Sequence, residues 1–177
     1  MTRTVAPKTL VLGGARSGKS AHAEGLMGDV ALYLATARRI DGDGDWDARI
    51  AAHVARRPAT WRTEETPDTD SLIGHLDAAI TPVLVDDIAT WLANAMDDAN
   101  AWDGGVDMTS ARSTLVHAVE RCAMPVTLVS AEVGLGVVPP TRSGRLFRDE
   151  LGAVNASLAE VCTDVLLLVA GLPLRLK

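Results

Sequence analysis

The stretch that decides the fold reads Thr9-Leu10-Val11-Leu12-Gly13-Gly14-Ala15-Arg16-Ser17-Gly18-Lys19-Ser20. Its last eight residues fit the pattern G-x-x-x-x-G-K-S, a phosphate-binding loop between a strand and a helix. The glycines let the backbone wrap around phosphate oxygens, and successive N–H groups point inward to bind an anion. Lys19 can reach the β- and γ-phosphates, and the Ser20 hydroxyl can bind Mg²⁺. The stretch therefore predicts binding of a nucleoside triphosphate.

The composition indicates one globular domain over residues 1–177. Apolar residues make up 47% of the chain, which is enough for a sizeable core. The net charge of -6 argues against a surface that coats nucleic acid. The two cysteines, Cys122 and Cys162, lack metal-ligand spacing, and no apolar run is long enough to span a bilayer. We therefore expect a cytoplasmic protein with no membrane span, no nucleic-acid partner, and two buried, reduced thiols.

Short apolar runs alternate with amphipathic segments along the rest of the chain. The runs predict strands over residues 9–12, 30–35, 83–85, 126–130, 165–170 and 174–177. Helices are expected over residues 20–27, 47–57, 68–79, 88–99, 109–122 and 144–161. The runs are continuous in apolar character, which is typical of parallel strands covered on both faces. The predicted fold class is therefore α/β, with a mostly parallel sheet flanked by helices in three layers.

Ligands of such sheets bind at the carboxyl ends of the strands, so the residues there are the ones to inspect. Asp86 and Asp87 follow the apolar run at 83–85. An acidic residue at a strand end beside a phosphate loop holds Mg²⁺ directly or through water. We assign that role to Asp86, together with Ser20. Asp87 better fits the N-cap of the next helix.

A histidine among arginines forms the second candidate site. Arg49, His53 and Arg56 or Arg57 are spaced to share a helical face. Neighbouring cations depress the pKa of an imidazole and favour its neutral, nucleophilic form. A solvated basic helix face explains the same spacing equally well, so the residues alone leave both interpretations open.

Three other segments are weaker candidates. Glu64 or Glu65 could recognise a base edge or a ribose. The glycines of residues 132–139 suggest a close backbone approach at another strand end. Arg142 and Arg145 are better explained as part of a polar helix surface.

Five motifs occur in a fixed order along the chain. They are G-G-A-R-S-G-K-S at 13–20, R-I-x-x-H at 49–53, R-P-x-x-W-R-T-x-E at 57–65, E-V-G-x-G-V-V-P at 132–139 and F-R-D-x-x-G-x-x-N at 147–155. Together they resemble the bifunctional adenosylcobinamide kinase/adenosylcobinamide-phosphate guanylyltransferase family over residues 9–177. The resemblance implies phosphorylation of the aminopropanol hydroxyl of adenosylcobinamide by ATP or GTP. GMP is then transferred from GTP to that phosphate through a guanylylated histidine. It also implies a homotrimer and a RecA-like P-loop NTPase fold.

The resemblance also implies roles for particular residues. The catalytic residues would be His53 and Lys19, and Ser20 and Asp86 would hold Mg²⁺. Nucleotide contacts would come from Gly13, Gly14, Ala15, Arg16, Ser17, Gly18, Lys19, Ser20, Ala35, Thr36, Ala37, Val54, Ala55, Arg56, Arg57, Glu65 and Asp86. The chain departs from the family pattern in a longer, more acidic stretch around 38–47, and in Ala52 and Asp87. None of these departures removes a residue with an assigned role.

Two other functions fit the phosphate loop. The first is a kinase of another small molecule, with His53 serving only as a phosphate ligand. The second is a nucleotide-binding regulatory module without catalysis. A DNA motor is disfavoured, because the acidic chain lacks interleaved aromatic and basic residues.

Overall fold

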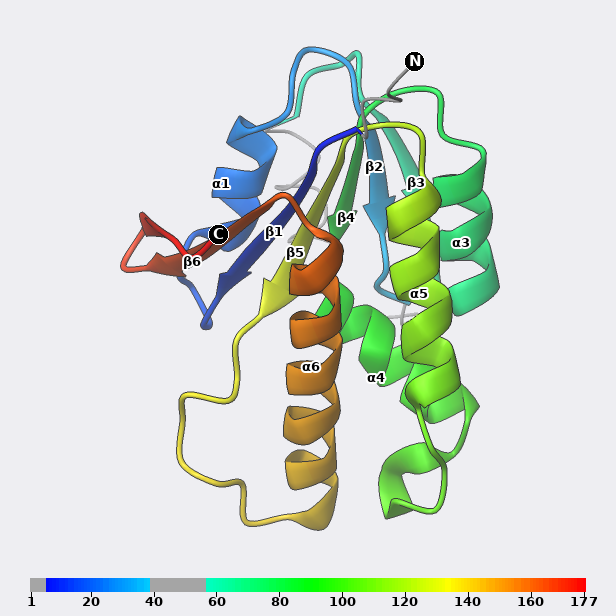
Figure 1. Cartoon of the computed structure of the whole chain (residues 1–177), viewed down its shortest axis with the longest axis vertical. Helices are drawn as coiled ribbons and strands as arrows, with labels where there is room; N and C mark the ends of the chain where they lie inside the picture. The colour runs from blue at the N-terminus through cyan, green and yellow to red at the C-terminus, as the bar shows by residue number, and fades with distance from the viewer. Residues whose placement is uncertain (1–5, 39–56) are drawn as a thin grey trace, which may run out of the picture.

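The computed structural model describes residues 6–38 and 57–177, which form one seven-stranded sheet with helices on both faces (Figure 1). The strands are β1 (Lys8–Gly13), β2 (Leu32–Ala35), β3 (Arg62–Glu65), β4 (Val83–Asp86), β5 (Val126–Ala131), β6 (Asp164–Val169) and β7 (Leu172–Arg175). The helices are α1 (Lys19–Gly25), α3 (Thr69–Asp77), α4 (Ile88–Asp98), the short 3₁₀ helix η1 (Ala101–Asp103), α5 (Thr109–Arg121) and α6 (Arg142–Val161).

The sheet order is β3-β2-β4-β5-β1-β6-β7, and every neighbouring pair is parallel except β6 and β7. The expected α/β fold with a mostly parallel sheet is therefore confirmed. β5 lies between β1, which leads into the phosphate loop, and β4, which ends in Asp86. All of these strands run in one direction, so their carboxyl ends meet at one edge of the sheet.

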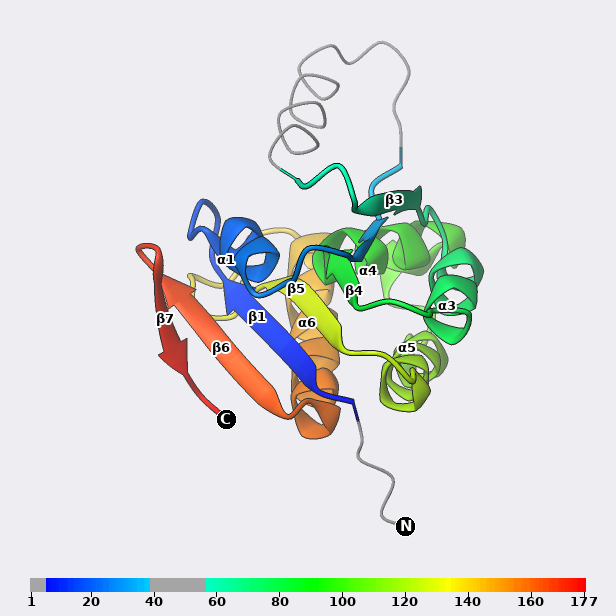
Figure 2. The same ribbon diagram turned by 90° about the horizontal axis from the view of Figure 1, so that it is seen from above.

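The two faces of the sheet are covered unequally. Helices α3 to α6 cover one face, and α1 lies on the other (Figure 2). Successive side chains of a strand point to opposite faces of the sheet, so Leu10 packs in the larger core and Val11 in the smaller one. The smaller core contains Val11, Ala23, Tyr33, Leu84, Val129 and Leu168. Burial on both faces explains why the sequences of the central strands are continuously apolar.

Short polar side chains begin three of the helices. Asp68 precedes α3 and accepts a hydrogen bond from the third N–H after it, at 2.8 Å. Asp87 does the same for α4, accepting from the N–H of Thr90 at 2.7 Å, so its expected capping role is confirmed. Thr141 caps α6, which therefore starts at Arg142, two residues earlier than expected.

Strand β3 was not expected from the sequence. Its four residues, Arg62–Glu65, read RTEE, and three of them are exposed. β3 pairs with β2 at the edge of the sheet. An edge strand with solvent on its faces needs no apolar run, so the pattern that revealed the other strands was absent here.

Two strands begin two residues away from their expected start, and the other expected strands agree within one residue at each end. β2 begins at Leu32 rather than Val30, whose side chain is 50% exposed. β7 covers 172–175 rather than 174–177, as an antiparallel edge strand against β6. Pro173 lies inside it, which an edge strand tolerates because one side of its backbone needs no ladder hydrogen bonds.

Buried residues near the amino ends of the strands include both cysteines and one lysine. Cys122 and Cys162 are free and buried, as expected, and burial raises the pKa of the Cys162 thiol to about 12. Lys8 is also buried, and its ammonium donates to the carbonyls of Cys122 and Met124 at 2.8 and 2.7 Å. Within the described ranges, no helix combines the length and apolar character needed to cross a membrane.

Candidate functional site

The phosphate loop leaves β1 at Gly13 and enters α1 through Gly18. Gly18 has φ +87°, a left-handed conformation that favours glycine. A Cβ on Gly13 would lie 2.3 Å from Oγ of Ser17 and 3.1 Å from the carbonyl of Leu168. Larger residues at these two positions would therefore force the loop out of shape, which explains why the motif needs both glycines.

Two neighbouring segments hold the loop from its sides. The N–H of Glu132, just after β5, donates to the carbonyl of Gly13 at 3.1 Å. The N–H of Gly171, in the turn between β6 and β7, donates to the carbonyl of Ser17 at 3.1 Å. The ammonium of Lys19 lies 3.4 Å from the carbonyl of Gly14, across the loop. Lys19 is thus already directed toward the space that the loop surrounds.

The two residues expected to hold Mg²⁺ are in contact, although 66 positions separate them in the chain. The hydroxyl of Ser20 donates to Oδ1 of Asp86 at 3.3 Å. A hydroxyl and a carboxylate are oxygen ligands of the kind that Mg²⁺ prefers. The described residues contain no group of three or more histidine, cysteine or acidic side chains able to hold a metal. A two-residue site completed by phosphate oxygens and water is the usual form of a Mg²⁺ site in nucleotide-binding proteins.

Tyr33 and Arg57 lie next to this pair. The Tyr33 hydroxyl donates to Oδ2 of Asp86 at 2.9 Å. The Arg57 guanidinium carbon lies 3.2 Å from the centroid of the Tyr33 ring, and Nε of Arg57 lies 3.6 Å from Oε1 of Glu24 on α1. Burial, together with the charge of Asp86, raises the pKa of Tyr33 above its ordinary value, so the phenol stays protonated and can donate.

The Arg57 side chain is only 6% exposed and contacts Glu24, Tyr33 and the Thr63 hydroxyl, to which it donates at 3.3 Å. A contact between this side chain and a nucleotide would require its release from these partners. Tyr33 and Glu24 were not singled out from the sequence. The only indication in the sequence was that Tyr33 carries a hydroxyl within an otherwise apolar strand.

Three of the expected contact residues form a row across the carboxyl edge of the sheet. Ala35, the last residue of β2, is paired with Glu65 of β3 on one side and with Asp86 of β4 on the other. Glu65 is exposed and Ala35 is partly exposed. The row extends from the Ser20–Asp86 pair toward β3, so a nucleotide at the phosphate loop would have polar and backbone groups along this side.

Thr36, which follows Ala35 in the chain, has a structural role in addition to any ligand contact. Thr36 is fully buried, and its hydroxyl donates to the carbonyl of Asp87 at 2.8 Å and accepts from its N–H at 3.0 Å. Asn94 of α4 donates to the Thr36 carbonyl at 2.7 Å. These bonds fix the backbone beside Asp86, and Ala37 follows directly. The remaining expected residues of the histidine segment, His53, Val54, Ala55 and Arg56, lie outside the described part of the chain.

Asn155 on α6, the last residue of the fifth sequence motif, holds the carboxyl end of β5. Its side chain is buried, accepts from the Ser130 hydroxyl at 2.6 Å and donates to the Ala131 carbonyl at 3.0 Å. Replacing Asn155 by alanine would leave both partners unsatisfied, so we expect a loss of about 2–3 kcal/mol in the free energy of unfolding. Urea denaturation would measure this change.

A matched control comes from the same helix. Ser157→Ala should change the free energy of unfolding by at most about 0.5 kcal/mol. Equal stability of the Asn155→Ala variant and the unmodified protein would show that these two hydrogen bonds do not hold the strand end.

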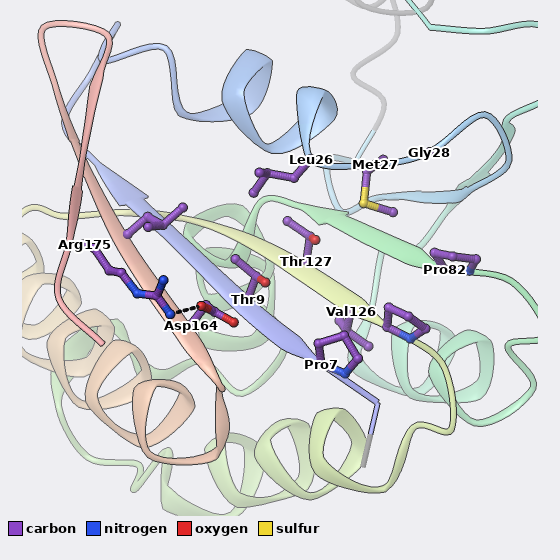
Figure 3. Close-up of a pocket in the computed structure, with 12 residues that line it drawn as sticks. Pro7, Thr9, Leu26, Met27, Gly28, Pro82, Val126, Thr127, Asp164 and Arg175 are labelled. Carbon is purple, nitrogen blue, oxygen red and sulfur yellow. Dashed lines mark hydrogen bonds and ion pairs between the residues drawn. The ribbon is translucent and has the colours of Figure 1, made fainter. Parts of the chain in front are cut away.

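A pocket of about 520 Å³ lies elsewhere on the α1 side of the sheet (Figure 3). Its lining includes Pro7, Pro82 and Pro125, each just before a strand, and the ion pair of Asp164 with Arg175 at 2.6 Å. These residues mark the amino ends of the parallel strands. The phosphate loop lies at the opposite end, so this pocket is separate from the site that holds phosphate.

The fold and the site define a class. A strand, a phosphate loop and a helix, with a Ser–Asp pair at the carboxyl edge of a parallel sheet, are the features of a P-loop nucleotide-binding protein. The fold is similar to that of an ATPase from the type III secretion system of pathogenic bacteria, with a TM-score of 0.60. The similarity covers 93% of this chain and 51% of that chain at 10% identity, so it concerns the fold alone.

The family follows from the sequence comparisons. A model of the family described as cobinamide kinase / cobinamide phosphate guanyltransferase matches residues 9–176. The chain is 39% identical over 186 residues to the bifunctional adenosylcobalamin biosynthesis protein CobU of Salmonella typhimurium, covering 95% of this chain and 98% of the relative. It is 42% identical over 176 residues to CobP of Pseudomonas aeruginosa, covering 96% and 97%. The chain therefore belongs to the cobinamide kinase / cobinamide phosphate guanyltransferase family.

Proposed function

We propose that this chain phosphorylates adenosylcobinamide and then transfers GMP to the phosphorylated product, giving adenosyl-GDP-cobinamide. Membership in the family supports the choice of substrate. The observation that carries the nucleotide chemistry is the contact of Ser20 with Asp86 directly beside Lys19 and the phosphate loop. A site of this kind grips a triphosphate and leaves the reacting phosphorus accessible to an acceptor.

In the first step, the aminopropanol hydroxyl attacks the γ-phosphorus of ATP or GTP. The bond to the bridging oxygen breaks, and the nucleoside diphosphate leaves. Lys19 and the loop N–H groups, from Gly13 to Ser20, stabilise the charge that spreads over the phosphate oxygens. Ser20 and Asp86 would hold Mg²⁺, which neutralises charge on the phosphate oxygens when it is bound.

In the second step, a nitrogen of His53 attacks the α-phosphorus of GTP, and pyrophosphate leaves. A phosphate oxygen of cobinamide phosphate then attacks the same phosphorus, and the P–N bond breaks to regenerate the imidazole. This covalent route divides one difficult transfer into two easier ones. Arg49 and Arg56 would stabilise the α-phosphate, while the residues at the sheet edge, from Ala35 to Ala37 and at Glu65, would contact the nucleoside.

One assay tests both steps. The purified protein is incubated with GTP, Mg²⁺ and adenosylcobinamide, and the products are identified by mass. We expect cobinamide phosphate first, and then GDP-cobinamide with an equal amount of pyrophosphate. Cobinamide phosphate without GDP-cobinamide would reduce the proposal to a kinase. Absence of any corrinoid-dependent product would contradict it.

We propose further that the chain works as a homotrimer in the cytoplasm. Exposed apolar side chains support an assembly: Val169, Leu172, Leu174 and Leu176 on β6, β7 and the residue after it, and Leu135 and Val137 in the loop after β5. Monomeric proteins rarely expose large contiguous apolar patches. Light scattering on the purified protein would measure a mass three times that of the 18.6 kDa chain if the proposal holds, and the mass of a monomer or dimer would contradict it.

A further inference from the structure

The Tyr33 hydroxyl makes a contact with Asp86 that the phosphate-loop motif does not require. Tyr33 is the only tyrosine in the chain and is only 4% exposed. Its ring packs with Val11, Leu84 and Val129 in the smaller core. The hydroxyl emerges from this apolar cluster at the carboxyl edge of the sheet, 2.9 Å from Oδ2 of Asp86.

The two oxygens of the Asp86 carboxylate therefore have different partners. Oδ1 accepts from Ser20 at 3.3 Å, and Oδ2 accepts from Tyr33 at the shorter distance. A carboxylate held at one oxygen cannot rotate freely, so the Tyr33 bond keeps the other oxygen directed at Ser20. Partners of this kind around metal ligands commonly set metal affinity.

Arg57 contacts one face of the Tyr33 ring. The guanidinium lies against the ring at 3.2 Å and is paired with Glu24 of α1 at 3.6 Å. The stack restricts the ring, and the ion pair restricts the guanidinium. Arg57 also follows His53 by four positions in the chain. A continuous set of contacts thus runs from the chain just after the histidine segment to the Ser20–Asp86 pair.

We propose that Tyr33 is a positioning residue that orients the Asp86 carboxylate for Mg²⁺, and that Arg57 keeps the Tyr33 ring in the orientation that this needs. The inference rests on the proposed function only in taking Ser20 and Asp86 as the Mg²⁺ site. The alternative is a tyrosine that merely satisfies its buried hydroxyl on the nearest carboxylate. The two differ in whether Tyr33 responds to Mg²⁺.

Tyr33→Phe is the sharpest variant, because it removes the hydroxyl and keeps the ring under Arg57. In the presence of a non-hydrolysable GTP analogue, we expect its affinity for Mg²⁺ to fall about tenfold. Binding of the analogue in EDTA should change by less than about twofold, since the loop itself is untouched. Trp102→Phe is the matched control, because the Trp102 indole donates to the Asp97 carboxylate of α4 and stacks on Phe147 of α6. Its Mg²⁺ affinity should equal that of the unmodified protein.

The single tyrosine offers a second readout that needs no catalysis. Labelling the ζ-carbon of tyrosine with ¹³C gives one NMR resonance, which belongs to Tyr33. Adding Mg²⁺ with the GTP analogue should shift this resonance, and Asp86→Asn should abolish the shift. A resonance that stays fixed while Mg²⁺ binds would overturn the proposal, and so would unchanged Mg²⁺ affinity in Tyr33→Phe. The NMR experiment on the unmodified protein decides the matter even if that variant does not fold.

Arg57→Lys tests the second half of the proposal. Lysine keeps the charge but loses the planar stack on the ring. We expect a weaker Mg²⁺ affinity by about threefold, because an ammonium packs less well on the ring than the planar guanidinium does. Wild-type affinity in this variant would overturn the role assigned to Arg57. Failure of the corrinoid assay would leave all of these Mg²⁺ readouts unaffected, so the two proposals fail independently.

Discussion

Replacing His53 by alanine should abolish transfer of GMP to cobinamide phosphate and leave the kinase step within about threefold of its normal rate. The nucleophile of the second step would be gone, and loss of a nucleophile typically lowers a rate by on the order of 10⁴-fold or more. In the proposed function, the first step needs only the loop, Lys19 and the Ser20–Asp86 pair. With GTP labelled at the α-phosphate, the unmodified protein should retain label after denaturation, in an adduct that acid removes. The variant should retain none.

The control for this experiment is another histidine. His117 lies on the exposed surface of α5, where its side chain is 70% exposed and faces Glu120. His117→Ala should retain the labelled adduct and both rates. An adduct that persists in His53→Ala would assign the nucleophile to another residue. A matching loss of the kinase step would instead show that His53 serves as a phosphate ligand, as in the rival function of a kinase of another small molecule.

The sequence contained most of the phosphate site because local chemistry determines it. Gly13 and Gly18 are needed for close approach and a positive φ, and both requirements are visible in a short motif. Asp86 was identified because it ends an apolar run, and parallel strands bring their carboxyl ends to one edge. The contact of Asp86 with Ser20 follows from the loop motif and from the shared edge of the parallel strands. The order of the strands in the sheet does not follow from either.

The contacts around Tyr33 could not be predicted from the sequence in the same way. They depend on β2 lying beside β4 and on Arg57 reaching across both α1 and β2, and these relations join residues far apart in the chain. Arg57 illustrates the difference. Its place after His53 suggests a phosphate ligand, but the structure surrounds its side chain with Glu24 and Tyr33. The spacing of residues along a chain indicates on which face of a helix a charged side chain lies. Only the tertiary packing shows which residues that side chain contacts.

The edge strand β3 shows a second reason for failure. The hydrophobic pattern detects strands by their apolar side chains, so it reveals the central strands and even the exposed, leucine-containing β7, but not the polar β3. β3 is defined by backbone hydrogen bonds to β2 rather than by its side chains. Glu65 could be named as a contact residue from its motif, but its place in a row with Ala35 and Asp86 required the register of the sheet.

Lys19→Ala should lower both activities by on the order of 10³-fold, and this pattern separates it from His53→Ala. In the proposed function, the same ammonium stabilises charge on the phosphates in each reaction, and removal of one such contact from a transition state costs roughly this factor. Its place across the loop, 3.4 Å from the Gly14 carbonyl, is compatible with either reaction. Because Lys19 contributes little packing, the free energy of unfolding should change by less than about 0.5 kcal/mol. Steady-state rates of both steps and urea denaturation would measure these effects.

The control for Lys19→Ala removes an equal charge elsewhere. Arg121 ends α5, beside the amino ends of the strands, and forms an exposed ion pair with Asp77 at 2.7 Å. Arg121→Ala should keep both activities, since an exposed pair contributes at most about 1 kcal/mol to stability and lies at the opposite end of the sheet. The contradicting result is a Lys19→Ala variant that loses phosphorylation but still forms the guanylylated protein at the normal rate. That result would show that the two reactions do not bind the nucleotide through the same contacts. The proposal of a single site at the phosphate loop would then be wrong.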